Sequence, residues 1–564
     1  MKLVALFAAL AVFAAPQAFA QDALNSRTAQ SGLPLDGARA MQRITHASLS
    51  ITVDPALRRI EAIAFHTVTV SADLTELQFD LDPRFVIASI SVNDVKLPHG
   101  DWSNPDGVLT LRLPEAAKAG DTLSVWINYG GRPHEATNPP WEGGFVWAET
   151  PDGQPWIATA VQGEGCDLFW PCIDHPAHRI DTLDLMVTVP DGLVAAANGR
   201  LFRTYANGNG TTTYHWQARD PSNYGISLQI GPYEVAQRDF VSRFGNTVPL
   251  KFWHLPADKA DGERLLGELE RYVAWFESAI GPYPFWDEKA GVAQTPHLGM
   301  EHQTINAYGN KFTRNPLGYD ELLFHEFAHE WFGNQITHAD LADLWLHEGF
   351  ATYMQVLYLE AAQGRVQANI ELWNQRRLIV GNSALVPLDG KTPDYMDSEA
   401  GWGTDIYAKG AWVLHSLRSF IGDEAFFATL TRFVYGRADP APGNFAPLSR
   451  STEDFIAIAE EESGRDLGWF FDTYLRHAEL PKLKAVRDGE DLILEWQTPS
   501  AADFEMPVEL KIDGYLVTVP MIGGRAKLEL ESETRPFQLD PHNTVLRYDE
   551  AVSAWREARK AESE

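Results

Sequence analysis

The sequence predicts a multidomain α+β protein in which a helix-rich region lies between two β-rich regions. Two changes of pattern carry this prediction. Short alternating or β-branched runs continue to about residue 239, and helical spacing of apolar residues then continues to about residue 480. Strand-like runs return from residue 481. With 564 residues, the chain is also too long for one compact core.

The composition is that of a globular protein with an acidic balance. Hydrophobic residues make up 45% of the chain, which excludes wholesale disorder. Lys and Arg number 46 against 77 Asp and Glu, a net charge of −31 that argues against a nucleic-acid partner. The only cysteines are Cys166 and Cys172, which excludes a cysteine-rich scaffold but leaves open whether the two pair.

Residues 1–20 are predicted to be a secretory signal peptide outside the fold. Lys2 precedes an apolar run, Pro16 breaks it, and Ala18-Phe19-Ala20 has the small-x-small pattern of a cleavage site. The run is short for a membrane-spanning helix. We therefore expect an exported chain, periplasmic or secreted, with no stable membrane insertion after signal removal. Export would permit a disulfide.

Residues 21–239 are predicted to form an antiparallel β domain. Gly, Pro, Asn and Asp clusters separate its strand-like runs, and no convincing helical stretch lies among them. The runs are ASLSITV, AIAFHTVTVSA, IASISVNDV, VLTLRL, TLSVWINY and LDLMVTV.

Residues 240–480 are predicted to form the helix-rich domain. Its first helix, over 262–281, has apolar residues at three- and four-residue spacing and stops at Gly281-Pro282. Further helical patterns cover 319–332, 346–363, 365–380, 405–420 and 452–476.

Residues 481–548 return to short strands with turns, which suits a small β-sandwich. Residues 549–564 form a charged, helical tail.

The strongest chemical signal is HEFAHE, which begins at His325. His325 and His329 are one helical turn apart, so both imidazoles can reach one metal ion. Glu326 is turned about 100° around the axis and can flank the ion as a general base. This is the zincin arrangement.

Two histidines leave a catalytic zinc one protein ligand short. Glu348 begins the next helical pattern, and a return helix would bring it against the first pair. The nitrogen ligands favour zinc over magnesium. Glu330 and His347 remain alternative ligands, although Glu330 points off the face that His325 and His329 share.

Several segments together resemble the aminopeptidase N family of gluzincin zinc peptidases, which includes leukotriene hydrolase. The similar segments are HEFAHEWFGN with LWLHEGFA, GPYPF at 281–285, HLGMEHQTINAYGN at 297–310, QGEGCDLFWPCIDHP at 162–176 and DIYAKGAWVLHSLR at 405–418. The resemblance implies a thermolysin-like catalytic domain over 240–480. The large C-terminal helical domain of many members is absent from this sequence, which suggests a more open cleft.

The resemblance implies one zinc ion per chain, with His325, His329 and Glu348 as its ligands. Zinc would lower the pKa of its water and polarise the scissile carbonyl. Glu326 would act as general base, and Tyr407 would hydrogen-bond the tetrahedral oxyanion.

The same resemblance assigns three residues to substrate binding. Glu301 would pair with a free α-ammonium group, and Gln162 would help to hold the same amine. A substrate without that cation would leave the Glu301 charge unpaired. Gly299 would let an edge strand approach the substrate backbone. His302 and His347 stand where family members usually have Asn, so hydrogen bonding near the site differs.

These observations favour a zinc aminopeptidase acting on peptides with a free N-terminus. Three alternatives remain. They are a thermolysin-like endopeptidase with the same zinc ligands, an epoxide hydrolase side activity, and a catalytically silent peptide-binding protein. The preferred N-terminal residue and the oligomeric state do not follow from the sequence.

Overall fold

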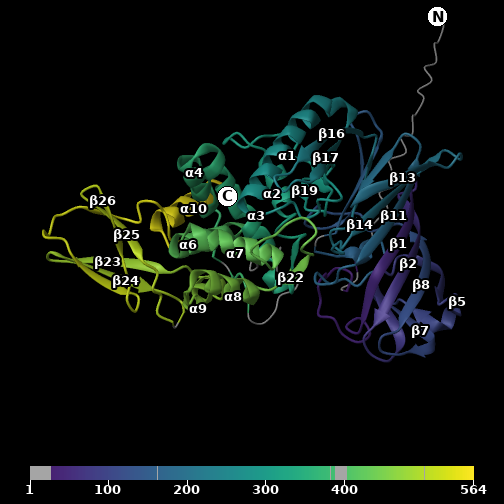
Figure 1. Ribbon diagram of the computed structural model, residues 1–564, viewed down its shortest axis with the longest axis horizontal. Coiled ribbons are helices and arrows are strands. Elements are labelled where there is room, and N and C mark those ends of the chain that lie inside the picture. Colours follow the sequence, from purple (N-terminus) through teal and green to yellow (C-terminus); the bar gives the residue numbers. More distant parts are fainter. Residues whose placement is uncertain are drawn as a thin grey trace, which may run out of the picture.

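The computed structural model describes residues 24, 27–161, 163–381, 383–387, 403–500 and 502–563. The predicted signal peptide and Gln162 lie outside the described residues. The elements form three parts in a row, a β-rich N-terminal part, a helical middle part and a smaller β-rich C-terminal part, as Figure 1 shows. This confirms the predicted multidomain α+β class.

The N-terminal part is built on an eight-stranded sheet. Its strands are β1 (Gln42–Asp54), β2 (Arg59–Val70), β4 (Val86–Val92), β5 (Val95–Lys96), β8 (Thr122–Gly131), β11 (Thr182–Pro190), β13 (Arg200–Ala206) and β14 (Thr211–Arg219). Their order is β13-β14-β11-β1-β2-β8-β4-β5. The other strand pairs of this sheet are antiparallel, which confirms the predicted antiparallel β domain, while β1 and β11 pair in parallel. The strand-like runs carry no information about which distant strand becomes a neighbour.

Two smaller sheets complete this part. Their strands are β3 (Leu74–Asp80), β6 (Trp102–Ser103), β7 (Val108–Ala117), β9 (Gly144–Glu149), β10 (Pro155–Ala160), β12 (Val194–Ala197) and β15 (Leu228–Gly231). The orders are β3-β7-β6 and β12-β15-β10-β9. The alternating apolar residues of β1 and β2 face one shared core with these sheets.

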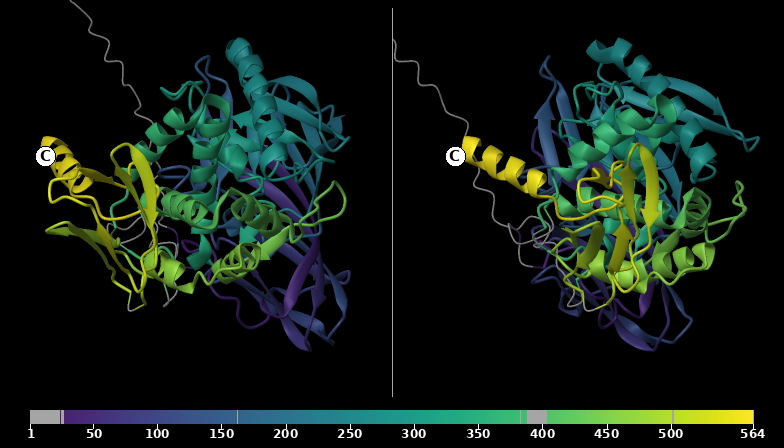
Figure 2. Two further views of the ribbon diagram at one scale, coloured as in Figure 1. Left: turned by 60° about the vertical axis from the view of Figure 1, so that its left-hand side comes forward. Right: turned by 90° about the vertical axis from the view of Figure 1, so that its left-hand side faces the viewer.

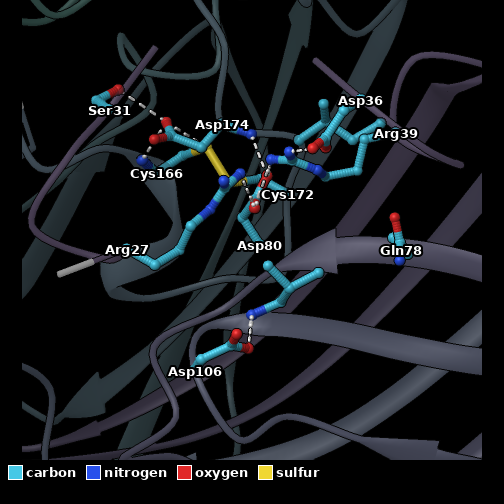
Figure 3. A network of polar contacts seen from close by, with 12 residues as sticks. Arg27, Ser31, Asp36, Arg39, Gln78, Asp80, Asp106, Cys166, Cys172 and Asp174 are labelled. Atoms are coloured by element: carbon cyan, nitrogen blue, oxygen red, sulfur yellow. Dashed lines mark hydrogen bonds and ion pairs between the residues drawn. A yellow bond between two sulfur atoms is a disulfide. The ribbon is translucent and has the colours of Figure 1, made fainter. Parts of the chain in front are cut away.

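A disulfide joins Cys166 to Cys172, which decides the pairing that the sequence left open. The segment of residues 27–41, which we call the N-terminal strap, lies against this disulfide loop (Figure 3). Arg27 and the buried Arg39 both pair with Asp80 at 3.1 Å. The Asp80 carboxylate in turn accepts from the Asp174 backbone amide at 2.9 Å.

The middle part opens with a five-stranded sheet. Its strands are β16 (Glu234–Val241), β17 (Thr247–His254), β18 (Ala290–Gln294), β19 (Gly299–Met300) and β20 (Asn306–Tyr308). The order is β16-β17-β18-β20-β19, which leaves β19 at an edge. The domain boundary placed between residues 239 and 240 falls inside β16.

The described residues of the middle part also form eight helices, of which α1 and α2 contact this sheet. They are α1 (Lys259–Ala279), α2 (Glu321–Ala328), α3 (Trp345–Gln363), α4 (Arg365–Arg376), α6 (Asp405–Ile421), α7 (Asp423–Tyr435), α8 (Thr452–Ser463) and α9 (Gly468–Leu475). Helix α7 was not predicted. The predicted helix over 452–476 is two helices, because Gly464 adopts a left-handed conformation (φ 64°) and ends α8.

The C-terminal part has two three-stranded sheets, β23-β24-β27 and β26-β25-β28. Their strands are β23 (Lys482–Asp488), β24 (Asp491–Gln497), β25 (Val508–Ile512), β26 (Tyr515–Val519), β27 (Arg525–Glu529) and β28 (Phe537–Leu539). Helix α10 (Glu550–Ser563) follows them. In Figure 2 this part, in olive and yellow, adjoins the helices on the side away from the N-terminal sheets. Within the described residues, no helix has the length and apolarity to cross a membrane.

Candidate metal centre and active site

Helix α2 presents the two predicted histidine ligands. Asp320 caps its N-terminus, since the Asp320 side chain accepts a hydrogen bond from the Leu323 amide at 3.1 Å. The helix ends at Ala328, one residue earlier than His329, but His329 keeps a right-handed helical conformation. The one-turn spacing of His325 and His329 is therefore preserved.

Helix α3 brings Glu348 to the two histidines. Glu348 lies in the first turn of α3, and its Oε2 is 3.2 Å from His325 Nε2 and 3.5 Å from His329 Nε2. The two Nε2 atoms are 3.3 Å apart. The structure thus places all three predicted ligand atoms at the corners of one small triangle.

This triangle fits a zinc ion. Ligands at about 2.1 Å from a tetrahedral zinc are about 3.4 Å from one another, close to the three separations observed here. His329 Nδ1 is 2.9 Å from the Phe332 carbonyl, so a proton on Nδ1 leaves Nε2 free to bind a metal. Two imidazoles and one carboxylate are also a donor set that zinc accepts.

Electrostatics within the triangle also favour a cation. Burial alone would lower the pKa of His329, but Glu348 and Glu301 raise it to about 10. Burial alone would raise the pKa of Glu348, yet His329 and His325 hold it well below its usual range. A zinc ion would take the place of the His329 proton.

The two alternative ligands lie elsewhere. Glu330 Oε1 accepts hydrogen bonds from the Thr304 amide at 2.8 Å and from Asn306 Nδ2 at 3.0 Å. His347 Nε2 lies 3.2 Å from the His338 amide and 3.0 Å from His338 Nδ1. Both side chains are therefore engaged in structural contacts away from the triangle.

Two further carboxylates lie beside the triangle. Oxygen atoms of Glu301 and Glu326 and a nitrogen of His329 all lie within 4.8 Å of one another. Burial raises the pKa of Glu326 well above its usual range, and Glu301 raises it further. Burial also raises the pKa of Glu301. A positive group in this cavity would relieve both desolvated carboxyls.

Glu301 is held by residues from two parts of the chain. Tyr224, in the loop between β14 and β15, donates its hydroxyl to Glu301 Oε1 at 3.2 Å. Asn334 donates its side-chain amide to the Glu301 carbonyl at 2.9 Å. The N-terminal part thus contributes directly to the position of the predicted substrate anchor.

Gly299 lies on edge strand β19, as predicted. The packing around Gly299 leaves no room for a side chain. A Cβ built at Gly299 would lie 2.5 Å from Glu326 Oε1 and 2.7 Å from Leu322 Cδ1. Any larger residue here would therefore displace Glu326 or α2.

Tyr407 projects from the first turn of α6 toward the metal triangle. Its ring centroid is 6.0 Å from that of His325. Burial raises the pKa of Tyr407 well above its usual range, and the neighbouring glutamates raise it further. The phenol therefore stays protonated and can donate a hydrogen bond.

These residues share one cavity of about 510 Å³, a size typical of small-ligand sites. Of the predicted site residues, only Gln162 is left unplaced, because it lies outside the described residues. The sequence missed Tyr224 and the apolar walls Trp141, Leu298 and Leu322. Tyr224 and Trp141 come from loops far from HEFAHE in sequence, and no local pattern marks them.

His302 occupies the position where the resembled family usually has Asn. It is fully buried, and its Nδ1 is 3.4 Å from Gln229 Nε2. His302 therefore contacts the N-terminal part of the molecule.

The region that carries the site is similar to known proteins. A family model described as the peptidase family M1 domain matches residues 304–474. Aminopeptidase M1 of Arabidopsis thaliana is 24% identical over 498 residues, which cover 80% of this chain and 53% of that protein. Aminopeptidase N of Streptomyces lividans is 26% identical over 362 residues, which cover 54% of this chain and 40% of that protein. The matches thus span about half or less of these curated relatives.

Solved structures match over a larger share. A mutant M1 zinc metallopeptidase from Deinococcus radiodurans, bound to a Tyr-Ser-Ala substrate, has a TM-score of 0.65 at 25% identity. The match covers 80% of this chain and 98% of that one. The family model, the curated relatives and this structure together show that the chain is similar to the M1 family of zinc metallopeptidases, the gluzincins that include aminopeptidase N.

Proposed function

We propose that the protein is a zinc-dependent aminopeptidase that removes N-terminal residues from peptides. The observation that carries the proposal is the Glu301 carboxylate, buried beside the metal triangle and Glu326. A carboxylate there can pair with the α-ammonium group of a peptide while the first peptide bond lies at the metal. A similar solved structure is bound to a Tyr-Ser-Ala substrate, which supports a peptide as the substrate class.

Different residues of this chain carry out different steps of the proposed hydrolysis. A zinc ion held by His325, His329 and Glu348 would supply Lewis-acid activation of water and of the scissile carbonyl. Glu326 takes the proton of the attacking water on its carboxylate and passes it to the leaving amine. Tyr407 donates its phenol to the oxygen on which negative charge develops.

Glu301 supplies the preference for N-termini. An acetylated substrate carries no cation, so its binding would bury the Glu301 charge without the substrate cation that would otherwise neutralise it. We therefore expect free-amine substrates to be preferred by at least about 100-fold, the ratio that about 3 kcal/mol corresponds to.

A pair of chromogenic substrates tests this function. Leucyl p-nitroanilide and its N-acetylated twin are assayed with and without a zinc chelator, and zinc is then restored. The proposal expects chelator-sensitive cleavage of the free-amine substrate alone. Cleavage of a longer, blocked peptide would indicate an endopeptidase instead. Zinc-loaded protein without any turnover would indicate a binding protein.

We also propose that the chain is exported to the periplasm or the medium. The support is the pattern of residues 1–20, with a cleavage site before Gln21. Expression of the full sequence followed by cell fractionation and N-terminal sequencing tests it. An extracytoplasmic protein beginning at Gln21 is expected, and a cytoplasmic protein that retains residues 1–20 would contradict the proposal.

A further inference from the structure

Buried residues 301–305 connect edge strand β19 to β20, and we call them the anchor loop because Glu301 begins them. The chain turns within this loop, where the Ile305 amide donates a hydrogen bond to the His302 carbonyl at 2.9 Å. Thr304 is the third residue of that turn and has a φ of 60°. A type II turn needs this left-handed conformation at its third residue, where glycine or asparagine is usual. A β-branched residue in this position is strained.

Contacts of the Thr304 side chain cross the boundary between the N-terminal and middle parts. Thr304 Oγ1 accepts a hydrogen bond from the Gly199 amide at 2.7 Å and another from Lys289 Nζ at 3.4 Å. Gly199 belongs to the N-terminal part, whereas Lys289 directly precedes β18 in the middle part. A glycine at position 304 would suit the turn better, but the buried Gly199 amide would lose this acceptor.

Lys289 is buried, and its ammonium group connects the same two parts. Nζ donates to the Ala197 carbonyl at 2.9 Å and to the Gly199 carbonyl, as well as to Thr304. The three ammonium hydrogens thus have three acceptors. The ammonium also lies 4.9 Å from the ring centroid of Trp216. Because a buried charge is costly unless it is hydrogen-bonded, these contacts hold the ammonium group in one place.

Further hydrogen bonds hold the backbone of the anchor loop. The Thr304 amide donates to Glu330 Oε1 at 2.8 Å, and Glu330 directly follows His329. Asn198 donates its side-chain amide to the Gln303 carbonyl at 2.7 Å. The turn is therefore tied both to the segment that follows α2 and to the N-terminal part.

We propose that Thr304 is a positioning residue for the substrate anchor, because its hydroxyl, held by Gly199 and Lys289, fixes the turn that orients the Glu301 carboxylate. The inference rests on the proposed aminopeptidase function and adds a residue that acts through Glu301. Thr304 is fully buried and does not line the cavity, so it does not touch the substrate. Since the turn begins directly after Glu301, a rotation at Thr304 moves the Glu301 side chain relative to the metal triangle.

Two substitutions remove the hydroxyl in different ways. Thr304→Val keeps the shape of the side chain, whereas Thr304→Gly also removes the backbone strain, because glycine readily adopts a φ of 60°. Both variants should raise KM for leucyl p-nitroanilide by about fivefold or more and change kcat by less than about twofold. Thr304→Ser keeps the hydroxyl, so both constants should stay within about twofold of the wild type.

Inhibition by isopentylamine measures the contact with the amine separately from catalysis. This molecule has the side chain and the amine of a leucine but no bond to hydrolyse, so its Ki does not depend on the catalytic steps. Ki should rise together with KM in Thr304→Val and Thr304→Gly, and it should keep the wild-type value in Thr304→Ser. Thermal melting and zinc content are measured for each variant to show that it is folded and loaded.

Thr429→Val is the matched control. Thr429 is also fully buried, and its hydroxyl donates to the Ala425 carbonyl at 2.7 Å within α7, outside the cavity. KM and Ki of this variant should equal those of the wild type. An equal rise in Thr429→Val would overturn the inference, because the loss of any buried hydroxyl would then have the same effect.

The remaining outcomes separate this inference from the proposed function. Unchanged KM and Ki in Thr304→Val and Thr304→Gly, or the same rise in Thr304→Ser, would overturn the inference alone, since the wild type would still hydrolyse the substrate. A fall in kcat at constant KM would also overturn it. No hydrolysis by the zinc-loaded wild type would overturn the proposed function and this inference with it.

Discussion

Three glutamates share the catalytic cavity, and their surroundings give them different tasks. Glu348 lies between two imidazoles that hold its pKa well below its usual range, which suits a metal ligand. Burial raises the pKa of Glu326, which suits a group that gains and then releases a proton. Glu301 accepts a hydrogen bond from Tyr224 and is the proposed anchor of the substrate amine.

Replacing Glu326 with its isosteric amide should abolish turnover without removing the metal. In Glu326→Gln, no carboxylate remains to take the proton from water, so kcat should fall by about 10³-fold. Zinc content, measured by elemental analysis, should stay at one ion per chain. A variant that kept more than a tenth of wild-type kcat would show that another group is the base.

Removing the Tyr224 hydroxyl should weaken the binding of the substrate amine by Glu301. Tyr224→Phe takes one donor from Glu301, and a hydrogen bond to a charged group is worth about 1.5–3 kcal/mol. We expect a KM rise of about tenfold or more, little change in kcat, and a smaller preference for free-amine over acetylated substrates.

Tyr214→Phe provides the control for this variant. The Tyr214 hydroxyl donates to the Leu193 carbonyl at 3.1 Å within the N-terminal part. Its loss should leave KM unchanged. Equal KM values for the two variants would refute a positioning role for Tyr224.

The candidate metal ligands could be predicted from the sequence because an α-helix places residues four apart on one face. Glu348 followed from the need for a third ligand and from a helix that returns to the site. Tyr224 and Trp141 could not be found in this way. Their positions depend on how the N-terminal sheets dock against the catalytic helices, and no spacing along the chain encodes that docking.

At the scale of elements, helices α3 and α6 carry the site and cross at two glycines. A Cβ at Gly410 would lie 2.8 Å from the Gly349 Cα, and one at Gly349 would lie 2.9 Å from the Gly410 Cα. Helix α3 carries Glu348 and α6 carries Tyr407. The close crossing therefore sets the distance between the proposed metal ligand Glu348 and the proposed oxyanion donor Tyr407.

A single methyl group at this crossing should separate the helices. Gly410→Ala should destabilise the fold by about 1–3 kcal/mol, the usual cost of overpacking, and should lower kcat. Gly267→Ala in α1 is the control, because its Cβ would meet only the Arg238 guanidinium at 4.0 Å. That variant should gain about 0.5–1 kcal/mol from helix propensity. Urea unfolding of both variants checks the contrast, and equal stabilities would contradict it.

Strand and helix types followed from periodicity, but their pairings and interruptions did not. Helices α8 and α9 share one continuous helical pattern, and only the left-handed Gly464 separates them. Similarly, β1 contains the alternation of an ordinary antiparallel strand yet pairs in parallel with β11. Tertiary packing decided both outcomes.

At the scale of the whole molecule, buried carboxyl groups connect the N-terminal strap to β3 and to the disulfide loop. Asp80 accepts from Arg27 and Arg39, and Asp174 accepts from the Ser31 hydroxyl at 3.0 Å. Burial raises the pKa of Asp80 to about 6 and that of Asp174 to about 7. A change in the protonation of these two carboxyls therefore affects contacts of both the N-terminal strap and the disulfide loop.

These raised pKa values predict a pH-dependent contribution to stability. A carboxyl whose pKa is higher in the folded chain stabilises the fold most below about pH 4, and this contribution is lost as pH rises through about 7. Asp174→Asn removes the titration but keeps an acceptor oxygen. The melting temperature of wild type relative to Asp174→Asn should fall between pH 4 and pH 7. A constant difference across that range would contradict the assignment.

The proposed aminopeptidase, loaded with zinc, should shorten peptides one residue at a time from a free N-terminus. Mass spectrometry over time on one peptide, with the amine free or acetylated, tests this claim most directly. We expect the free peptide to give a ladder of products that each lack one more N-terminal residue, and the acetylated peptide to stay intact. Internal fragments, or equal loss of both peptides, would contradict Glu301 as the anchor of the substrate amine.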